Sequence, residues 1–416
     1  IVYDVFSVGN FFNRTDSDSR FVRHDSGTLG TDNFIAGNNA GDSITSGGNY
    51  NTVVGNEAGT AITTGDQNVA VGYQALDALD TGIRNVAIGT TALTTDTKGE
   101  ASTAIGHGAL FTQNFTSSTT SNNTAVGYHA GVNVTTGTAN TLIGSNAGDA
   151  LTDADNNVAV GVGSLGGDTQ GSKSTAIGYA ALFAQNFTSA THSHNVAIGN
   201  LAGTSITTGV QNTIVGSEAG DALTDADYNV AIGIGALSSD TKGNRTVAIG
   251  KGALAVQNLT SSTDTHNTAV GYEAGNQITT GQGNTLIGGL AGDAITTGIN
   301  TTIVGYLAGS GVSTGTNNTM VGQGAGTAAT GSYNNFFGAG NGTAAGYAMT
   351  SGSKNTILGG FSGNQDGLDI RTGDSNIVLS DGDGNPRLIC NSSGVFTIKG
   401  IYDNTSGDGT NVTINA

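Results

Sequence analysis

The stretch Asn140-Thr-Leu-Ile-Gly144 decides how this chain folds, because close variants of it recur at nearly constant intervals. The same five residue types stand at Asn284-Thr-Leu-Ile-Gly288. Most steps are seventeen positions long, as from Gly127 to Gly144, and every fourth step is twenty-one, so the whole pattern repeats after seventy-two positions. A fixed period of this length is typical of an architecture built by stacking similar units. The glycines that end the copies are Gly37, Gly55, Gly72, Gly89, Gly106, Gly127, Gly144, Gly161, Gly178, Gly199, Gly216, Gly233, Gly250, Gly271, Gly288, Gly305, Gly322, Gly338 and Gly359.

The residues before each glycine are mainly β-branched or aliphatic, which predicts a short strand. Seventeen residues are too few for a strand, a full helix and a return, but they suit one solenoid coil of two short strands and two turns. We therefore predict an all-β fold, a parallel β-roll or β-solenoid of about 19 coils, over residues 33–363. Residues 1–32 and 364–416 lie outside the period. Because the open ends of a stacked sheet need cover, we expect an N-terminal cap or docking segment and a β-rich C-terminal cap or module.

Alternation along the strands assigns their side chains to two faces. In Val86-Ala-Ile88, Val86 and Ile88 share one face and Ala87 lies on the other. The residue before the glycine is nearly always Ile or Val, and we expect it to form an aliphatic ladder inside the coils. The middle residue is apolar as well, so the opposite face also needs cover. Another copy of the same chain is the simplest cover.

Three further columns of the repeat indicate close stacking. The glycine after the strand suits a tight corner, where a Cβ would clash or φ must be positive. A small residue follows three positions later, as at Ala147, and lets neighbouring backbones approach. Stacked asparagines at the strand starts are able to hydrogen-bond along the axis, which we interpret as a structural ladder rather than a ligand-binding array. They are Asn33, Asn51, Asn68, Asn85, Asn123, Asn140, Asn157, Asn195, Asn212, Asn229, Asn267, Asn284, Asn318, Asn334 and Asn355.

Two copies, Asn85-Val-Ala-Ile-Gly-Thr-Thr-Ala92 and Asn195-Val-Ala-Ile-Gly-Asn-Leu-Ala202, resemble the head repeat of YadA-like trimeric autotransporter adhesins. The resemblance implies a left-handed parallel β-roll, wound as a homotrimer with the second strand face towards the three-fold axis. The coils here are longer than in that family, and its neck, heptad stalk and membrane barrel are not found in these residues. The turn Ala202–Gly209 and the segment Ser375–Arg387 are similar to repeats in tail-fibre proteins of marine and cyanobacterial phages.

Composition excludes several functional classes. The net charge of −18 disfavours nucleic acid and anionic membrane surfaces as partners, because both attract cations. The single cysteine, Cys390, excludes an internal disulfide framework and a thiolate metal site. No apolar run reaches the ~20 residues that span a bilayer, so we expect no membrane insertion.

The sequence gives only weak evidence for a metal-binding or catalytic site. His192 and His194, with His266 in a later block, suggest a metal site, but solvated histidines fit better. Asp381-Gly-Asp-Gly-Asn385 resembles the start of a calcium loop, yet Ser392 stands where glutamate is needed, so we predict a β-turn. We interpret the repeated acidic residues as surface charge. These are Asp149, Asp153, Asp155, Asp221, Asp225 and Asp227.

The longer steps insert extra residues at Phe111–Asn122, Phe183–His194 and Leu254–His266. We expect these segments to protrude, either as recognition loops or as tolerated changes in loop length. Every acidic cluster recurs with the repeat, which catalysis does not require, so we predict no catalytic, cofactor or metal site and no enzyme activity.

The sequence thus favours a structural and adhesive fibre protein at a virion surface or outside the cell, a phage tail-fibre segment for host attachment. The alternatives are a bacterial trimeric adhesin head and a polysaccharide-degrading tailspike. The predicted partners are further copies of the chain, other fibre or baseplate proteins at the termini, and a host-surface glycan or protein.

Overall fold

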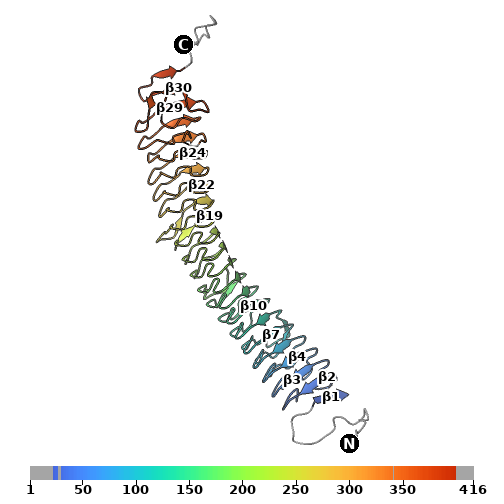
Figure 1. The fold of residues 1–416 in the computed structure, drawn as a ribbon. Coiled ribbons are helices and arrows are strands. Elements are labelled where there is room, and N and C mark those ends of the chain that lie inside the picture. Colours follow the sequence, from blue (N-terminus) through green and yellow to red (C-terminus); the bar gives the residue numbers. More distant parts are fainter. Residues whose placement is uncertain (1–21, 27–29, 341, 400–416) are drawn as a thin grey trace, which may run out of the picture. The chain divides into compact units, whose positions relative to one another are not determined.

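The computed structural model describes residues 22–26, 30–340 and 342–399, which contain strands and turns and no helix (Figure 1). They belong to two compact units. The first extends to Gly252 and includes Asn258–Thr265, and the second comprises Ala253–Gln257 and the residues from His266 onward. Most of the expected N-terminal cap, including Phe6, Phe11 and Phe12, lies outside the described residues, as does the end of the expected C-terminal module.

The first unit holds one large sheet and three short two-stranded sheets. The large sheet contains β1 (Val22–Ser26), β2 (Thr31–Ala36), β3 (Thr52–Val54), β4 (Val69–Val71), β5 (Val86–Ile88), β7 (Thr103–Ile105), β9 (Thr124–Val126), β10 (Thr141–Ile143), β11 (Val158–Val160), β13 (Thr175–Ile177), β15 (Val196–Ile198), β16 (Thr213–Val215), β17 (Val230–Ile232) and β19 (Val247–Ile249). The short sheets pair β6 (Gly99–Glu100) with β8 (Thr119–Thr120), β12 (Gly171–Ser172) with β14 (Thr191–His192), and β18 (Gly243–Asn244) with β20 (Thr263–Asp264).

The second unit contains a parallel run of strands that ends in an antiparallel meander. The parallel strands are β21 (Thr268–Val270), β22 (Thr285–Ile287), β23 (Thr302–Val304), β24 (Thr319–Val321), β25 (Asn335–Phe337), β26 (Thr356–Leu358) and β29 (Ile377–Ser380). A small hairpin joins β27 (Asn364–Gln365) to β28 (Leu368–Asp369). The meander continues from β29 through β30 (Pro386–Cys390) to β31 (Phe396–Ile398).

Strands of successive coils pair in parallel and in register. In β10 and β11, for example, Thr141, Leu142 and Ile143 face Val158, Ala159 and Val160, which are one repeat further along the chain. The neighbouring rungs in Figure 1 follow this pattern within each unit. The prediction of a parallel β-solenoid with one coil per repeat is confirmed. The parallel ladder continues to β29, beyond residue 363, where the sequence pattern predicts the repeat to end.

Two details of the predicted coil are wrong. The first is the number of strands, since most coils contain one three-residue strand rather than two. Non-glycine residues with φ near +55° interrupt the extended chain twice per coil, as at Ala139 and Asn146. The turns still bond from coil to coil, for example from Gly148 N to Ser164 O at 2.9 Å.

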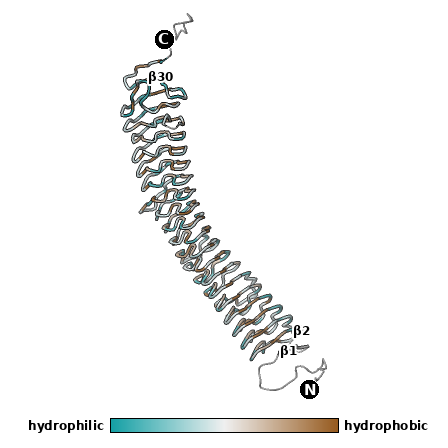
Figure 2. The backbone as a smooth tube through the Cα atoms, in the orientation of Figure 1, coloured by the Kyte–Doolittle hydropathy of each residue, from teal (hydrophilic) through white to brown (hydrophobic). Residues whose placement is uncertain are grey.

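The second error concerns which strand face is buried. The middle residue points into the coil, where Ala87 and Leu142 are fully buried, whereas Ile88 and Ile143 before the glycines are each 38% exposed. The expected interior ladder of Ile and Val therefore lies on the outside. The coil interior is narrow, and it is filled by one strand side chain together with residues from the turns. Figure 2 accordingly shows hydrophobic and hydrophilic residues mixed within the coils.

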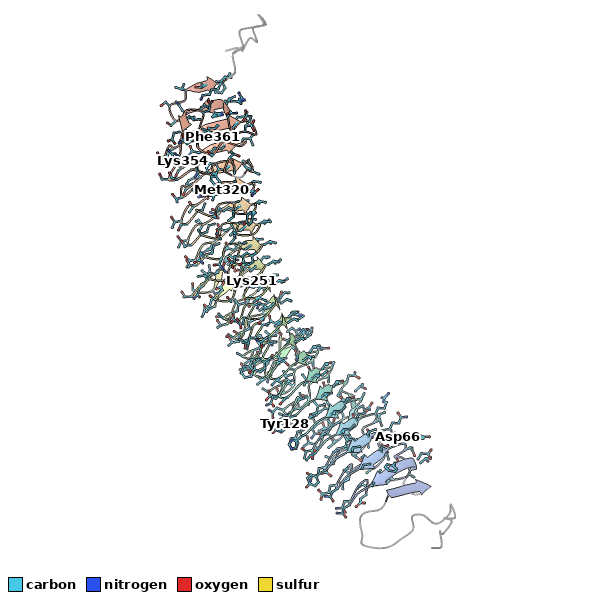
Figure 3. All side chains as sticks on the ribbon, in the orientation of Figure 1. Asp66, Tyr128, Lys251, Met320, Lys354 and Phe361 are labelled. Carbon is cyan, nitrogen blue, oxygen red and sulfur yellow. The ribbon has the colours of Figure 1, made fainter. Side chains whose placement is uncertain are left out.

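Volume matching inside the coil explains this choice of face. Leu142 is followed in the next turn by Gly148, whose added Cβ would lie 2.7 Å from a Leu142 methyl carbon. In another coil the small Ala70 is followed at the same spacing by Leu76, and both are fully buried. Met320, fully buried and labelled in Figure 3, is paired in the same way with a glycine, Gly326. In these coils a large strand residue is thus matched by a small turn residue, and the reverse. Where both are small, as at Ala125 and Gly131, leucines of the neighbouring coils reach into the space; they are Leu110 and Leu142.

Glycine and asparagine fix the spacing of the coils. Gly144 has φ +135°, and a Cβ there would lie 2.5 Å from Gly161 O in the next coil, so both reasons predicted for glycine apply. Asn140 donates from Nδ2 to Ala154 O at 2.8 Å and accepts at Oδ1 from Asn157 N at 2.9 Å. The asparagine ladder is therefore structural, and its partners are mainly the backbone of the next coil.

Candidate functional site

The outer face of the strands is the first candidate site. We use "outer face" for the first and third residues of each three-residue strand, which point away from the buried middle residue. In the three-residue strands from β3 to β24 the first residue is always Thr or Val and the third always Ile or Val. Their exposure is intermediate or high, and the third residues include Ile198 at 38% and Ile287 at 42%. Each unit thus presents a continuous stripe of methyl groups to its surroundings.

This stripe is free of charge. The chain carries 13 Lys and Arg and 31 Asp and Glu residues, yet none occupies an outer-face position in the three-residue strands from β3 to β26. The side chains of Thr and Val have nearly the same shape, so the outer face is almost the same on each strand and the next. Extended apolar surfaces of this kind are common at protein and membrane interaction sites and in ligand-binding grooves, so the stripe is a candidate interaction surface.

The inserted loops are the second candidate site. We use this name for residues 116–121, 188–193 and 260–265, all in the first unit. Each loop lies over the preceding coil and forms a two-stranded parallel sheet with it, such as Gly99 with Thr119. Phe115, 6% exposed, anchors the start of the first loop, and residues 116–118 at its tip are exposed. The extra residues thus stack on the preceding coil and expose their tip, and their protrusion from the coils stays a prediction.

A buried carboxylate holds each of the first two inserted loops. Asp96 is fully buried, and its Oδ1 accepts hydrogen bonds from Gly99 N at 2.9 Å and Phe115 N at 3.1 Å. Gln113 Nε2 donates to Asp96 Oδ2 at 2.6 Å and to Ser102 Oγ at 2.9 Å. Burial raises the pKa of the Asp96 carboxyl, and the hydrogen bonds only partly oppose this shift. Asp168 and Gln185 repeat the arrangement in the next block.

Our sequence reasoning missed these residues, although a signal for them exists. The asparagine column is interrupted at Ser102, Ser174 and Thr246, each immediately before one of the longer steps, and at Thr301, before a regular step. In the first block Gln113 replaces the missing amide, because its Oε1 accepts from Asn123 Nδ2 at 2.8 Å. Gln113, which precedes the first inserted loop, therefore supplies a substitute side chain to the ladder. An aspartate and a glutamine that recur in every block beside the interruptions before the longer steps could have revealed the network.

The exposed ends of the inserted loops differ from block to block. Thr120 in the first block is matched by His192 in the second and Asp264 in the third. His192 Nδ1 lies 3.3 Å from Lys173 Nζ, and its ring packs edge-on against His194. Asp264 pairs with Arg245 at 3.0 Å. An ammonium group beside His192 disfavours a cation there, in agreement with a solvated histidine.

The segment from Asp381 to Asn385 forms a turn, as predicted, with Gly384 N donating to Asp381 O at 3.2 Å. Asp381 Oδ1 accepts from Asn385 N at 2.9 Å, and Oδ2 accepts from Arg387 Nε at 3.0 Å. Hydrogen bonds from Asn385, together with Arg387, lower the pKa of Asp381 to about 2. These interactions occupy the carboxylate oxygens that a calcium ion would need.

The repeated aspartates have more than the surface role that we expected. Asp155 Oδ1 accepts from Thr138 N at 2.7 Å, and Asp227 Oδ1 accepts from Val210 N at 2.8 Å, so both link adjacent coils. Asp153 and Asp225 are exposed. Burial raises the pKa values of Asp149 and Asp221. The latter two carboxylates are half-buried beside the turns.

Across residues 22–26, 30–340 and 342–399, no group of three or more His, Cys, Asp or Glu side chains is arranged to hold a metal ion. No helix in this part of the chain has the length and apolar character needed to cross a membrane. Comparison of the chain with protein-family models, with curated proteins and with solved structures found no match.

Proposed function

We propose that this chain is a segment of a non-enzymatic homotrimeric fibre, with a structural and adhesive role. Three copies pack through their outer faces, so that each stripe of Ile, Val and Thr is covered by the stripes of two other copies. The observation that carries the proposal is the uncharged, exposed outer face on successive coils of both units. Burial of this aliphatic surface contributes about 25 cal/mol per Å² to association.

A second copy is the occupant that the geometry favours. The outer face repeats at the spacing of parallel strands, ~4.8 Å, and a parallel copy of the same chain has this repeat over its whole length. Side chains of the same size then meet at every rung. The asparagine and glycine columns hold the coils rigidly, as a stiff fibre requires.

We assign the adhesive role to the inserted loops, whose exposed ends carry Thr120, His192 and Asp264 at equivalent positions of the three blocks. Loops on a rigid scaffold are common recognition sites, and three loops on each of three chains would give avidity. We therefore propose that the fibre acts as phage tail fibres do, by attaching to a host surface. Its location would be a virion surface or the outside of a cell. Aspartates inside the coils serve the scaffold, since Asp96 and Asp168 are both held by backbone amides.

Sedimentation of a double variant tests the trimer. Ile143→Asp together with Ile177→Asp places two charges per chain on the outer face, where assembly would bury them. Ile143 is 38% exposed and neither side chain fills the coil interior, so the variant should fold. We expect wild type to sediment as a trimer at micromolar concentration and the variant as a monomer. Thr208→Asp, on an exposed turn, is the control and should remain trimeric. A monomeric wild type would refute the proposal.

The same proteins test adhesion. Retention of the trimer on a panel of cell-surface glycans should exceed that of the monomeric double variant by tenfold or more, because avidity multiplies weak contacts by roughly 10²–10⁴. Equal retention of both, or release of reducing ends from any glycan, would contradict a non-enzymatic adhesive fibre.

A further inference from the structure

The outer face changes character at the meander of the second unit. Antiparallel pairing sets Ile377 opposite Cys390, and Cys390 opposite Phe396. In the same way it sets Leu379 opposite Leu388, and Leu388 opposite Ile398. Paired residues lie on the same face of a sheet. We call these six side chains the terminal patch; they are Ile377, Leu379, Leu388, Cys390, Phe396 and Ile398.

The terminal patch is exposed and apolar. Ile377 is 50% exposed, Leu379 41%, Phe396 51% and Ile398 45%. Side chains on the opposite face of β29 and β30 are buried, since Val378 is 1% and Ile389 6% exposed. The patch continues the outer face of the preceding strands, where Leu358 is 51% exposed. Its large side chains contrast with the Thr, Val and Ile of the regular rungs.

The three cations of residues 366–399 are each paired with an aspartate of the same chain. Arg371 bonds to Asp369 at 2.7 Å, Arg387 to Asp381 at 2.5 Å and Lys399 to Asp366 at 3.2 Å. These pairs leave no charge on the patch itself. The six side chains of the patch carry no charge themselves, so an identical apolar patch fits them better than a charged ligand.

The regular rungs cannot fix the alignment of copies along the fibre. In β21 to β24 the first outer-face residue is Thr and the second is Ile or Val. If one copy shifts by one coil along another, each strand therefore meets an almost identical strand. Such a shift loses contact at the end coils alone. Repetitive interfaces of this kind specify their register weakly. A unique element has to select the aligned arrangement.

We infer that the terminal patch is this element: in the proposed trimer it packs against the same patch of two other copies and sets their axial register. The inference rests on the proposed function. Misalignment by one coil would set Ile377 and Leu379 of one copy opposite Thr356 and Leu358 of another, and would leave part of the patch without an identical partner. Only the aligned arrangement buries all three patches together.

Cross-linking at a distant rung tests the inference on the full chain. Cys390→Ser removes the native thiol, and Thr302→Cys or Val304→Cys places one thiol on the outer face of β23. Oxidation should produce covalent dimers within aligned trimers, because disulfides require short Cα–Cα distances. Adding Phe396→Thr and Ile398→Thr should lower the yield at least about twofold, since a single competing register of equal stability halves it. Ile198→Thr, 38% exposed on β15, is the matched control and should keep the full yield.

The outcomes separate the two proposals. If the patch variant sediments as a trimer and cross-links like its parent, the register inference fails and the trimer stands. The same holds if neither cysteine cross-links in a trimeric parent, because the copies would then not be aligned. A trimeric, aligned but less stable patch variant would mean that the patch is covered by its own chain, which also overturns the inference. If the single-cysteine protein without the patch substitutions is itself a monomer, the proposed function is refuted as well.

Discussion

Replacing Asn140 by alanine tests how the coils are held together. Asn140 makes two hydrogen bonds to the next coil, to Ala154 O and from Asn157 N. Ala154 is 1% exposed and Asn157 is fully buried, so water cannot replace the lost partners. A buried polar group left without a partner costs about 1–3 kcal/mol, so two such groups give about 2–6 kcal/mol. The alanine variant should therefore lose a large fraction of its unfolding free energy.

The matched control is Asn133→Ala. Asn133 is exposed and makes one hydrogen bond to Asp149 O at 2.7 Å, which water readily replaces. We expect this change to cost less than about 1 kcal/mol. Asn140→Asp is a second comparison, because it keeps the acceptor for Asn157 N but turns an oxygen towards Ala154 O. It should still be clearly destabilised.

Hydrogen exchange is the assay of choice, because a repeat protein opens locally and a single unfolding transition does not capture each coil. The amide of Asn157 and its neighbours should exchange far faster in Asn140→Ala than in wild type, at equal protein concentration. Guanidinium unfolding gives the corresponding loss in total stability. If Asn140→Ala and Asn133→Ala behave alike in both measurements, the asparagine ladder is not what joins the coils.

Three further predictions use the same measurements. Gly144→Ala should lower the unfolding free energy by more than about 3 kcal/mol, because a φ of +135° is strained for alanine and the Cβ would lie 2.5 Å from a backbone oxygen. The control Gly382→Ala, which has open space around the added Cβ, should leave it unchanged. Leu142→Ala should cost about 3–5 kcal/mol, and adding Gly148→Leu should restore at least half of this, as volume matching requires; no recovery would contradict it. Burial raises the pKa of Asp96, so the unfolded chain ionises first as pH rises, and stability falls between the usual value near 4 and the raised pKa. The stability of Asp96→Asn relative to wild type should therefore increase over that window and then level off; a pH-independent difference in unfolding free energy would refute the assignment.

The sequence alone determined the architecture. A glycine at nearly every seventeenth position, preceded by β-branched residues, leaves room for one coil and nothing longer, and the asparagine column follows from the same period. These features depend on local sequence and on stacking of identical units, which a single period expresses fully. The role of glycine at positions such as Gly144 could be predicted for the same reason.

Which strand face is buried depended on the tertiary structure. Both faces of Thr141-Leu-Ile143 carry apolar groups, so alternation could not choose between them. The choice depends on the turn residues that share the interior, because Gly148 leaves the space that Leu142 fills. The Asp96 network was hidden for a related reason: its members, from Asp96 to Asn123, belong to different coils and meet only once these coils are stacked. Periodicity records what every coil has in common, whereas packing between unlike residues of neighbouring coils is decided in three dimensions.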